Sequence, residues 1–265
     1  MASDKQNRVL VTGGGTYLGR NIASALLAEG ADVTLILREG NQQRLGALEQ
    51  RVRWYTADIW DVASLKGRAR GHGTVIHTVG SMVADPTQGF TYHRLNVASA
   101  RNAASMCVSD GVSHLILMSA INAPWVSSKY VQAKREAENT VKRMGIQVSV
   151  IRAPITYIRG TKRPVFFQMM SLLGRIPPLS WLYLGRIAPM PLDILARGVS
   201  RIALSPADGY RNFHAQDLRR LNKRHEIRGD VDTMHTFAAP QNETLPFETL
   251  DEDTPFGWIP SESDD

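Results

Sequence analysis

The sequence has little cysteine and no long apolar run, and both absences limit what the protein can be. Of 265 residues only Cys107 is a cysteine, so no internal disulfide can form. Cys107 falls at helical spacing among alanines, a pattern typical of a buried thiol. No stretch of about 18 uninterrupted apolar residues occurs, which argues against a membrane-spanning helix. The 43% hydrophobic content is enough for the full core of one domain.

Two further absences concern the ends of the chain. Residues 1–7 hold neither an apolar signal core nor an arginine-rich leader, so we expect no cleavable presequence. Residues 241–265 contain eight acids and no base, which leaves residues 1–240 with 31 bases against 17 acids, a net charge of +14. A body this basic favours an anionic partner such as a phosphorylated cofactor, an acidic subunit, an anionic lipid or nucleic acid. An ordinary basic surface is the alternative.

What the chain does contain is an alternation of short apolar runs with helical patterns. Runs rich in Val, Ile and Leu predict strands at residues 8–12, 32–37, 52–55, 74–78, 114–119 and 147–153. Helical patterns occupy residues 18–29, 62–66, 91–109, 129–144 and 191–204. Since no hairpin signal separates the strands, the sequence predicts an α/β fold with a doubly wound parallel sheet, the Rossmann fold.

The second half of the chain is less regular. We expect residues 1–205 to form one domain that includes a small lobe at 154–205, and residues 206–265 to be a C-terminal extension. From about residue 235 this extension is expected to be an extended tail, because it has too little apolar content to offset the entropy of ordering. The apolar stretch 165–195 suits a lipid or quinone ligand or a membrane surface, with ordinary helix packing as the alternative.

A glycine loop joins the first predicted strand to the first predicted helix. It reads Thr-Gly-Gly-Gly-Thr-Tyr-Leu-Gly over residues 12–19. Glycines let the backbone approach a pyrophosphate, whose charge is met by the helix N-terminus. This context favours dinucleotide binding over a bare structural turn. The residues expected to contact the cofactor here are Gly13, Gly15, Thr16, Tyr17, Leu18 and Gly19.

Residues after the next three strands complete the expected cofactor site. Arg38 follows the second strand, where an arginine can pair with the 2′-phosphate of NADPH, whereas an acid there would hold the free ribose of NAD. We therefore expect NADPH. NAD remains possible if Arg38 is simply exposed to solvent. Adenine, ribose and nicotinamide are expected against Asp58, Ile59, Thr78, Val79 and Gly80.

A serine, a tyrosine and a lysine form the candidate catalytic group. Ser119 ends the fifth strand, and Tyr130 and Lys134 lie four residues apart in the next helix, where they share one face. The lysine is expected to lower the pKa of the phenol, and Ser119 to hydrogen-bond a substrate carbonyl. A solvated helix face is the alternative for an isolated Tyr-x-x-x-Lys. We identify no metal site.

Taken together, these motifs resemble the short-chain dehydrogenase/reductase superfamily, in its extended or atypical branch, over residues 8–205. The resemblance rests on the glycine loop, Asn96-Val97, Ser119, Tyr130 with Lys134, and Arg152-Ala153-Pro154. Within that branch, the loop and the run that begins at Tyr130 are most similar to the nucleotide-binding accessory subunit of mitochondrial complex I (NADH:ubiquinone oxidoreductase). Members associated with coenzyme Q biosynthesis are similar too.

The resemblance implies roles for individual residues. Tyr130 is expected to be the general acid/base, Lys134 to hold the nicotinamide ribose, and Pro154 to contact the cofactor. One family glycine is missing, replaced by Thr16 or by Tyr17 depending on the register. A side chain at that position is expected to crowd the pyrophosphate and weaken binding or reshape the loop.

Two functions remain open at this point. The first is an NADP(H)-binding structural subunit of a mitochondrial respiratory assembly, on the matrix side of the inner membrane, in which the nucleotide stabilises the fold. The second is an active NADPH-dependent oxidoreductase or isomerase for a hydrophobic carbonyl, with a cytoplasmic location as the alternative. The intact Ser119, Tyr130 and Lys134 favour the enzyme, whereas the altered loop, the basic body, the acidic tail and the resemblance to the complex I subunit favour the subunit. We do not expect nucleic-acid binding, because the basic run 211–228 lacks a recognition motif.

Overall fold

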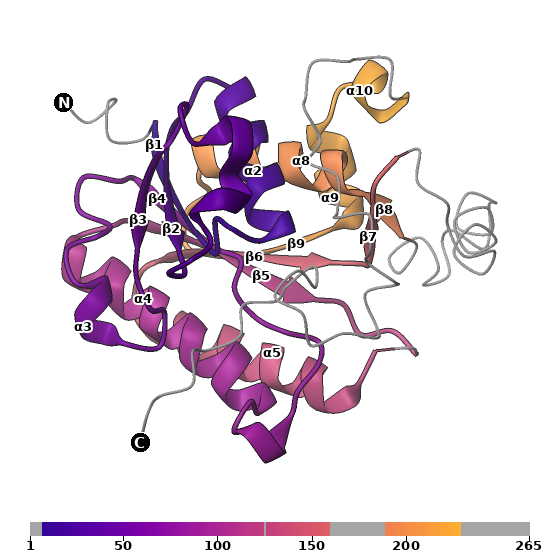
Figure 1. The fold of residues 1–265 in the computed structure, drawn as a ribbon. Coiled ribbons are helices and arrows are strands. Elements are labelled where there is room, and N and C mark those ends of the chain that lie inside the picture. Colours follow the sequence, from indigo (N-terminus) through magenta and orange to yellow (C-terminus); the bar gives the residue numbers. More distant parts are fainter. Residues whose placement is uncertain (1–6, 125, 160–188, 229–265) are drawn as a thin grey trace.

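The protein is built on a parallel sheet of seven strands. In the computed structural model, residues 7–124, 126–159 and 189–228 are described (Figure 1). The strand order is β3-β2-β1-β4-β5-β6-β9, and every neighbouring pair is parallel. The strands are β1 (Arg8–Thr12), β2 (Asp32–Leu37), β3 (Arg53–Thr56), β4 (Thr74–His77), β5 (His114–Ala120), β6 (Gln147–Ala153) and β9 (Tyr210–His214). This order confirms the expected doubly wound fold, whose direction of winding reverses between β1 and β4.

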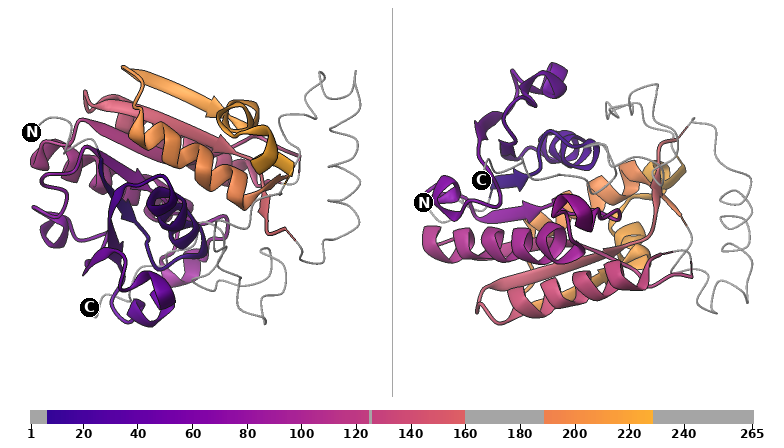
Figure 2. Two further views of the ribbon diagram at one scale, coloured as in Figure 1. Left: turned by 90° about the horizontal axis from the view of Figure 1, so that it is seen from above. Right: turned by 60° about the horizontal axis from the view of Figure 1, so that its bottom comes forward.

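Helices cover both faces of the sheet (Figure 2). On one face lie α2 (Tyr17–Ala28), α8 (Leu192–Leu204) and α9 (Ala215–Leu221), and on the other α3 (Val62–Leu65), α4 (Ser99–Asp110) and α5 (Ser128–Lys142). The shorter elements are η1 (Gln42–Leu48), η2 (Pro86–Gln88), the π-helix η3 (His93–Ala98), α10 (Arg224–Arg228) and a two-stranded pair of β7 (Thr156–Tyr157) with β8 (Met190–Pro191). Among the described residues, no helix is long and apolar enough to cross a membrane.

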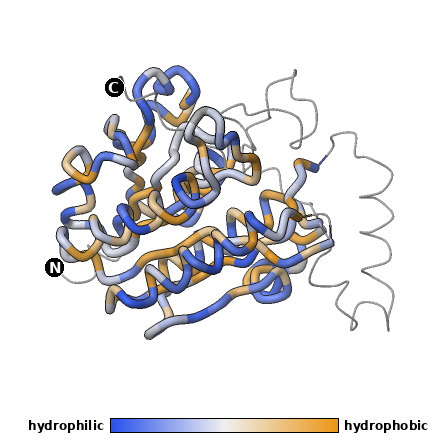
Figure 3. Tube along the Cα trace, turned by 90° about the horizontal axis from the view of Figure 1, so that it is seen from below, coloured by the Kyte–Doolittle hydropathy of each residue, from blue (hydrophilic) through white to orange (hydrophobic). Residues whose placement is uncertain are grey.

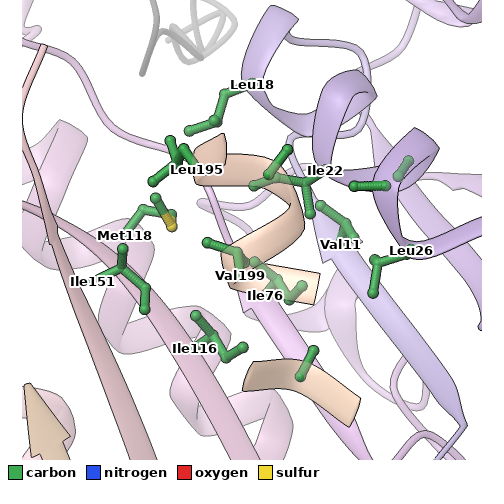
Figure 4. Close-up of a cluster of buried hydrophobic side chains, with 14 of the residues drawn as sticks. Val11, Leu18, Ile22, Leu26, Ile76, Ile116, Met118, Ile151, Leu195 and Val199 are labelled. Carbon is green, nitrogen blue, oxygen red and sulfur yellow. The ribbon is translucent and has the colours of Figure 1, made fainter. Parts of the chain in front are cut away.

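The core consists of two apolar layers, one on each side of the sheet. Strand β5 is buried along its whole length, which explains the apolar run from Leu115 to Met118 at its centre. On the α2 and α8 side, Leu18, Ile22 and Leu195 pack over residues of the central strands (Figure 4). Along the helices of the other face, hydrophobic and hydrophilic residues alternate (Figure 3), so that one side of each helix contacts the sheet. Cys107 is fully buried in this second layer.

The sheet continues past residue 205, where we expected the domain to end. Strand β9 pairs with β6 in parallel, from Val148 opposite Tyr210 to Arg152 opposite His214. Its sequence, Tyr-Arg-Asn-Phe-His, lacks an apolar face because it forms the edge of the sheet, so periodicity alone gave no strand signal. The residues from 160 to 188 and from 229 onward lie outside the described part of the chain. The expectations for most of the stretch 165–195 and for the tail therefore stay as predictions.

Ion pairs attach the C-terminal helices to this core. Arg201 of α8 contacts Glu226 of α10 at 2.8 Å and Glu29, just after α2, at 2.7 Å, and it donates a hydrogen bond to the carbonyl of Leu221. The hydrogen bond from Arg201 holds the pKa of Glu226 near 2, well below its usual value. The segment 206–228 is therefore part of the folded domain and not a separate extension.

Candidate functional site

The glycine loop lies between β1 and α2, at the carboxyl edge of the sheet where the winding reverses. Thr16 forms the N-cap of α2: its hydroxyl donates to the carbonyl of Gly13 at 2.7 Å and accepts from the amide of Gly19 at 3.1 Å. The Thr16 side chain is thus buried within the loop itself. Its hydroxyl is turned toward the backbone of the loop and completes the helix cap. Whether Thr16 or Tyr17 weakens pyrophosphate binding stays a prediction.

Two glycines of this loop allow contacts that a side chain would prevent. Gly13 has a φ of +72°, and a Cβ atom there would lie 2.7 Å from Oγ1 of Thr78. A Cβ on Gly19 would lie 2.2 Å from the carbonyl oxygen of Gly13. The first turn of α2 consequently packs directly on the loop, which leaves its N-terminal amides at the edge where a phosphate would bind. Leu18 does not face that edge, because its side chain belongs to the core (Figure 4).

The segment after β2 lies against the same loop. Arg38 follows the last residue of β2 and is half-buried, and its carbonyl accepts a hydrogen bond from the amide of Asn41 at 3.1 Å. A Cβ on Gly15 would come within 3.1 Å of the Cβ of Asn41, so the two loops are in contact. The segment that follows Arg38 therefore contacts the glycine loop at Asn41. The pairing of Arg38 with a 2′-phosphate stays a prediction.

The residues after β3 divide between loop and core. Asp58 is half-buried, and its carboxylate accepts a hydrogen bond from the amide of Trp60 at 2.9 Å. Ile59 is fully buried in the layer that also contains Leu65 and Val97. The side chain of Ile59 therefore stabilises the core and presents no surface to a ligand, unlike our expectation for the adenine site.

The stretch after β4 connects the glycine loop with the candidate catalytic group. Thr78 is buried beside Gly13 and donates a hydrogen bond to the carbonyl of Thr12 at 2.6 Å. Val79 is buried in the core. A Cβ on Gly80 would lie 2.6 Å from both the amide oxygen of Asn96 and the amine of Lys134. Only a glycine at position 80 leaves room for these two polar groups to approach the backbone.

Asn96 is held by the π-helix η3, which precedes α4. Its amide group donates to the carbonyls of Ser81 and Tyr92 and accepts from the amide of Ser81. A π-helical turn is uncommon and often occurs at functional sites. Asn96 was noted in the sequence only as part of the resemblance, and its fixed place beside Gly80 and Lys134 required the tertiary structure.

Tyr130 and Lys134 lie together on the buried face of α5. The amine of Lys134 is 5.7 Å from the centre of the Tyr130 ring and donates to the carbonyl of Met118 at 3.2 Å. Tyr130 is 1% exposed, and its hydroxyl has no hydrogen-bond partner among the described residues. A buried polar group without a partner costs roughly 1–3 kcal/mol. Such a group is consistent with a site that is completed by a ligand.

Burial decides the protonation of both side chains. It lowers the pKa of Lys134 to about 7, against the opposing effect of the Glu138 carboxylate. It raises the pKa of Tyr130, and this exceeds the lowering by the nearby charge of Arg135. The expectation that the lysine lowers the pKa of the phenol is therefore not met, because desolvation penalises the phenolate more than neighbouring cations stabilise it.

Ser119 does not join this pair. Its hydroxyl donates to a carboxylate oxygen of Glu138 at 2.6 Å, and the same carboxylate pairs with Arg135 and with Arg152. Consecutive strand residues point to opposite faces, and the next residue, Ala120, is the one that shares a cleft with Tyr130. The prediction that Ser119 orients a substrate carbonyl is thus wrong, since the hydroxyl of Ser119 is hydrogen-bonded to α5 through Glu138.

The sequence patterns did not lead us to expect a role for Glu138, which anchors the helix of the site. It is 2% exposed and connects the helix that carries Tyr130 and Lys134 to the ends of β5 and β6. The signal was present in the sequence, because Tyr130, Lys134 and Glu138 recur every four residues along one helical face.

An apolar cleft opens at Tyr130. Ala120 and Ile121 line it from the end of β5, and Ala153 and Pro154 from the end of β6. The remaining lining residues are Met82, Val126, Tyr130 and Ile155. The lining of the cleft is apolar, and its volume is small, about 20 Å³. Among the described residues, no cluster of metal ligands occurs.

Comparison with known proteins identifies the family of the chain. A family model described as NAD(P)H-binding matches residues 13–166, more than half of the chain. A ceramide reductase of Caulobacter vibrioides (strain NA1000 / CB15N) is 28% identical over 222 residues, which cover 83% of this chain and 68% of that protein. The short-chain dehydrogenase/reductase family 42E member 1 of Danio rerio is 30% identical over 120 residues, 44% of this chain and 30% of the relative.

Solved structures agree on the fold. The dTDP-glucose 4,6-dehydratase DesIV from Streptomyces venezuelae, solved with NAD bound, superposes with a TM-score of 0.56 at 18% identity, covering 77% of this chain and 74% of that one. The UDP-Glc/GlcNAc 4-epimerase from Campylobacter jejuni gives 0.57 at 13% identity, with coverages of 80% and 82%. From the family match and the architecture together, the chain belongs to the NAD(P)H-binding family and is a Rossmann-fold protein of the short-chain dehydrogenase/reductase type.

Proposed function

We propose that this protein is an NADPH-dependent oxidoreductase that reduces the carbonyl group of an apolar, lipid-like or quinone-like substrate. The observation that carries the proposal is the buried hydroxyl of Tyr130, which has no partner among the described residues and belongs to a side chain that lines a small apolar cleft and lies beside Lys134. The similarity to a ceramide reductase over most of the chain supports a reductase with an apolar substrate. The residues present also fit the cofactor, because Gly13 and Gly19 let the first turn of α2 pack directly on the loop, with its N-terminal amides at the edge where a pyrophosphate would bind.

A protonated Tyr130 favours reduction of a carbonyl over oxidation of an alcohol. NADPH, when bound, supplies the hydride that a carbonyl carbon accepts. Tyr130 holds the proton that the carbonyl oxygen takes up, and its raised pKa keeps this proton in place at neutral pH. Lys134, whose pKa lies near 7, is charged in slightly acidic solution and then favours the phenolate that remains after proton transfer.

A second candidate is the nucleotide-binding structural subunit of a mitochondrial respiratory assembly of the complex I type. It is favoured by Ala120, which lies in the cleft beside Tyr130 and offers no hydroxyl to a substrate carbonyl. In that case the dinucleotide would act as a ligand of the native state, and a concentration of 100 times its Kd would stabilise the fold by about 2.7 kcal/mol.

Ala120→Ser separates the two candidates. We expect the full-length protein to oxidise NADPH in the presence of long-chain ketones or quinones, and we expect the added hydroxyl to increase kcat/KM at least several-fold. The physical reason is a new hydrogen bond to the carbonyl oxygen, whose charge grows in the transition state. Initial rates of NADPH loss with apolar carbonyls and with matched water-soluble ones provide the measurement. Absence of NADPH oxidation by both proteins with every carbonyl, despite tight NADPH binding, would favour the subunit.

Arg38 is expected to set the preference for the phosphorylated cofactor. Arg38 directly follows β2, in a segment that contacts the glycine loop, and a guanidinium there can form charge-assisted hydrogen bonds with a 2′-phosphate. Arg38→Asp should reduce the ratio of NADH to NADPH dissociation constants at least tenfold, about 1.4 kcal/mol. Fluorescence titration with both nucleotides measures this ratio, and Arg101→Asp, on the exposed side of α4, is the matched control. Equal affinity of the unmodified protein for NADH and NADPH would contradict the assignment.

A further inference from the structure

Besides the apolar cleft, a cavity with a polar lining lies at the opposite edge of the sheet from the glycine loop. Its volume is about 220 Å³. It is lined by Arg8 at the start of β1, Thr34 of β2, Arg53 and Tyr55 of β3, and Gly67, Arg68, Arg70 and His72 from the connection between α3 and β4. Arg8 and Thr12 are the two ends of β1, so five residues of extended chain, about 13 Å, separate this cavity from the glycine loop. The cavity is therefore distinct from the dinucleotide site.

Guanidinium groups outnumber carboxylates around this cavity. Four of the lining residues are arginines. Among the described residues, two carboxylates reach them: Asp32, which pairs with Arg8 and Arg53, and Asp110, which lies 3.8 Å from Arg70. Asp110 is in addition occupied by the amides of Gly67 and Ala69, to which its oxygens lie at 3.0 and 2.9 Å. The walls consequently retain an excess of positive charge.

The arginines are held in place by neighbouring groups. The guanidinium of Arg68 lies over the ring of Tyr55, 5.2 Å from its centre, and donates to the carbonyl of Ser64. This cation–π contact keeps a planar, charged donor group at the wall of the cavity. His72 contributes no charge, because burial lowers its pKa, and its ring is hydrogen-bonded to Thr34 and to the carbonyl of Ala69. The positive potential thus comes from arginines, which remain charged at every physiological pH.

We propose that this cavity is a binding site for the phosphate group of a small, soluble phosphomonoester. Guanidinium groups match phosphate oxygens with two parallel hydrogen bonds, and several of them around one cavity stabilise a dianion. The volume is below the roughly 300–1,000 Å³ of a pocket for a drug-sized ligand. It therefore suits a phosphate group with a short substituent and not a second dinucleotide.

Calorimetric titration of the full chain with inorganic phosphate and with methyl phosphate tests the proposal. We expect saturable binding that weakens at least tenfold in Arg68→Gln/Arg70→Gln, because this pair removes two cavity charges and leaves the Asp32 ion pairs intact. Arg101→Gln/Arg211→Gln is the matched control, since both residues are exposed elsewhere and the net charge changes equally. Arg38→Gln distinguishes the cavity from the cofactor site, and it should leave phosphate binding unchanged.

Several results would overturn the proposal. Equal weakening of phosphate binding in Arg68→Gln/Arg70→Gln and in Arg101→Gln/Arg211→Gln would show a nonspecific effect of net charge. Loss of phosphate binding in Arg38→Gln alone would assign the anion to the cofactor site. Binding to vesicles that contain phosphatidic acid, without measurable binding of either soluble phosphate, would replace the small molecule with a lipid headgroup. None of these measurements depends on turnover of NADPH, so the proposed reductase activity can fail while this site is confirmed.

Discussion

Replacing Tyr130 with phenylalanine is expected to reduce the turnover of a carbonyl substrate by about 100-fold or more, with nucleotide binding nearly unchanged. The ring fills the same buried space, and the hydroxyl that is lost has no partner among the described residues. Stability should therefore hold or increase slightly, because a buried polar group without a partner is removed. Steady-state kinetics, nucleotide titration and thermal unfolding of the same preparation measure the three quantities separately.

Tyr210→Phe is the matched control for this change. Tyr210 is a half-buried tyrosine at the start of β9, opposite Val148, and it takes no part in the cleft. The control should retain full activity. If Tyr130→Phe kept the turnover of the unmodified protein, the proton would have to come from another group and the proposed role of Tyr130 would be wrong.

Gly13→Asp should abolish measurable dinucleotide binding, a loss of at least about 100-fold or 2.7 kcal/mol. Three effects act together at this position. The φ of +72° is unfavourable for any residue with a Cβ, that Cβ would lie 2.7 Å from Oγ1 of Thr78, and the new carboxylate would face the pyrophosphate. Nucleotide titration combined with circular dichroism tests whether binding is lost in a protein that still folds.

Gly30→Asp isolates the contribution of the site from that of the backbone. Gly30 follows the other end of α2 with a φ of +83°, and no atom lies within 4 Å of the Cβ that it would gain. This variant carries a comparable backbone strain and the same added charge, and it should bind the dinucleotide normally with a modestly lower melting temperature. Equal loss of binding in both variants would mean that strain or net charge, and not the approach of a phosphate to Gly13, explains the effect.

A buried network of polar side chains anchors α5 to the sheet. The Glu138 carboxylate joins Ser119, Arg135 and Arg152, and so connects the middle of α5 to the ends of two central strands. This buried network lies one helical turn beyond Lys134, which limits the freedom of Lys134 and Tyr130 to move relative to the sheet. Ser119, at the end of β5, is buried and takes part in this network through its hydroxyl.

Local patterns in the sequence were sufficient for the central fold. Six strands were predicted within one or two residues, because most of them are short apolar runs that are buried on both faces; β3, which is partly exposed, is the exception. The glycine loop and the Tyr130 and Lys134 pair were recognisable for the same reason: their spacing along one loop or one helical turn is a local property. Strand β9 was missed, because an exposed edge strand has no apolar face to reveal it.

Contacts between distant residues were decided only by the tertiary structure. Whether Ser119 or Ala120 faces Tyr130 depends on the register of β5 in the sheet. A shift of one residue along the strand moves a side chain to the opposite face. The raised pKa of Tyr130 depends on how completely the surrounding layers exclude water. The arginine cavity likewise gathers residues from β1, β3 and the connection after α3, segments that no spacing rule joins. The sequence by itself determined the fold class and the dinucleotide site, and the packing of the layers decided which side chains meet within them.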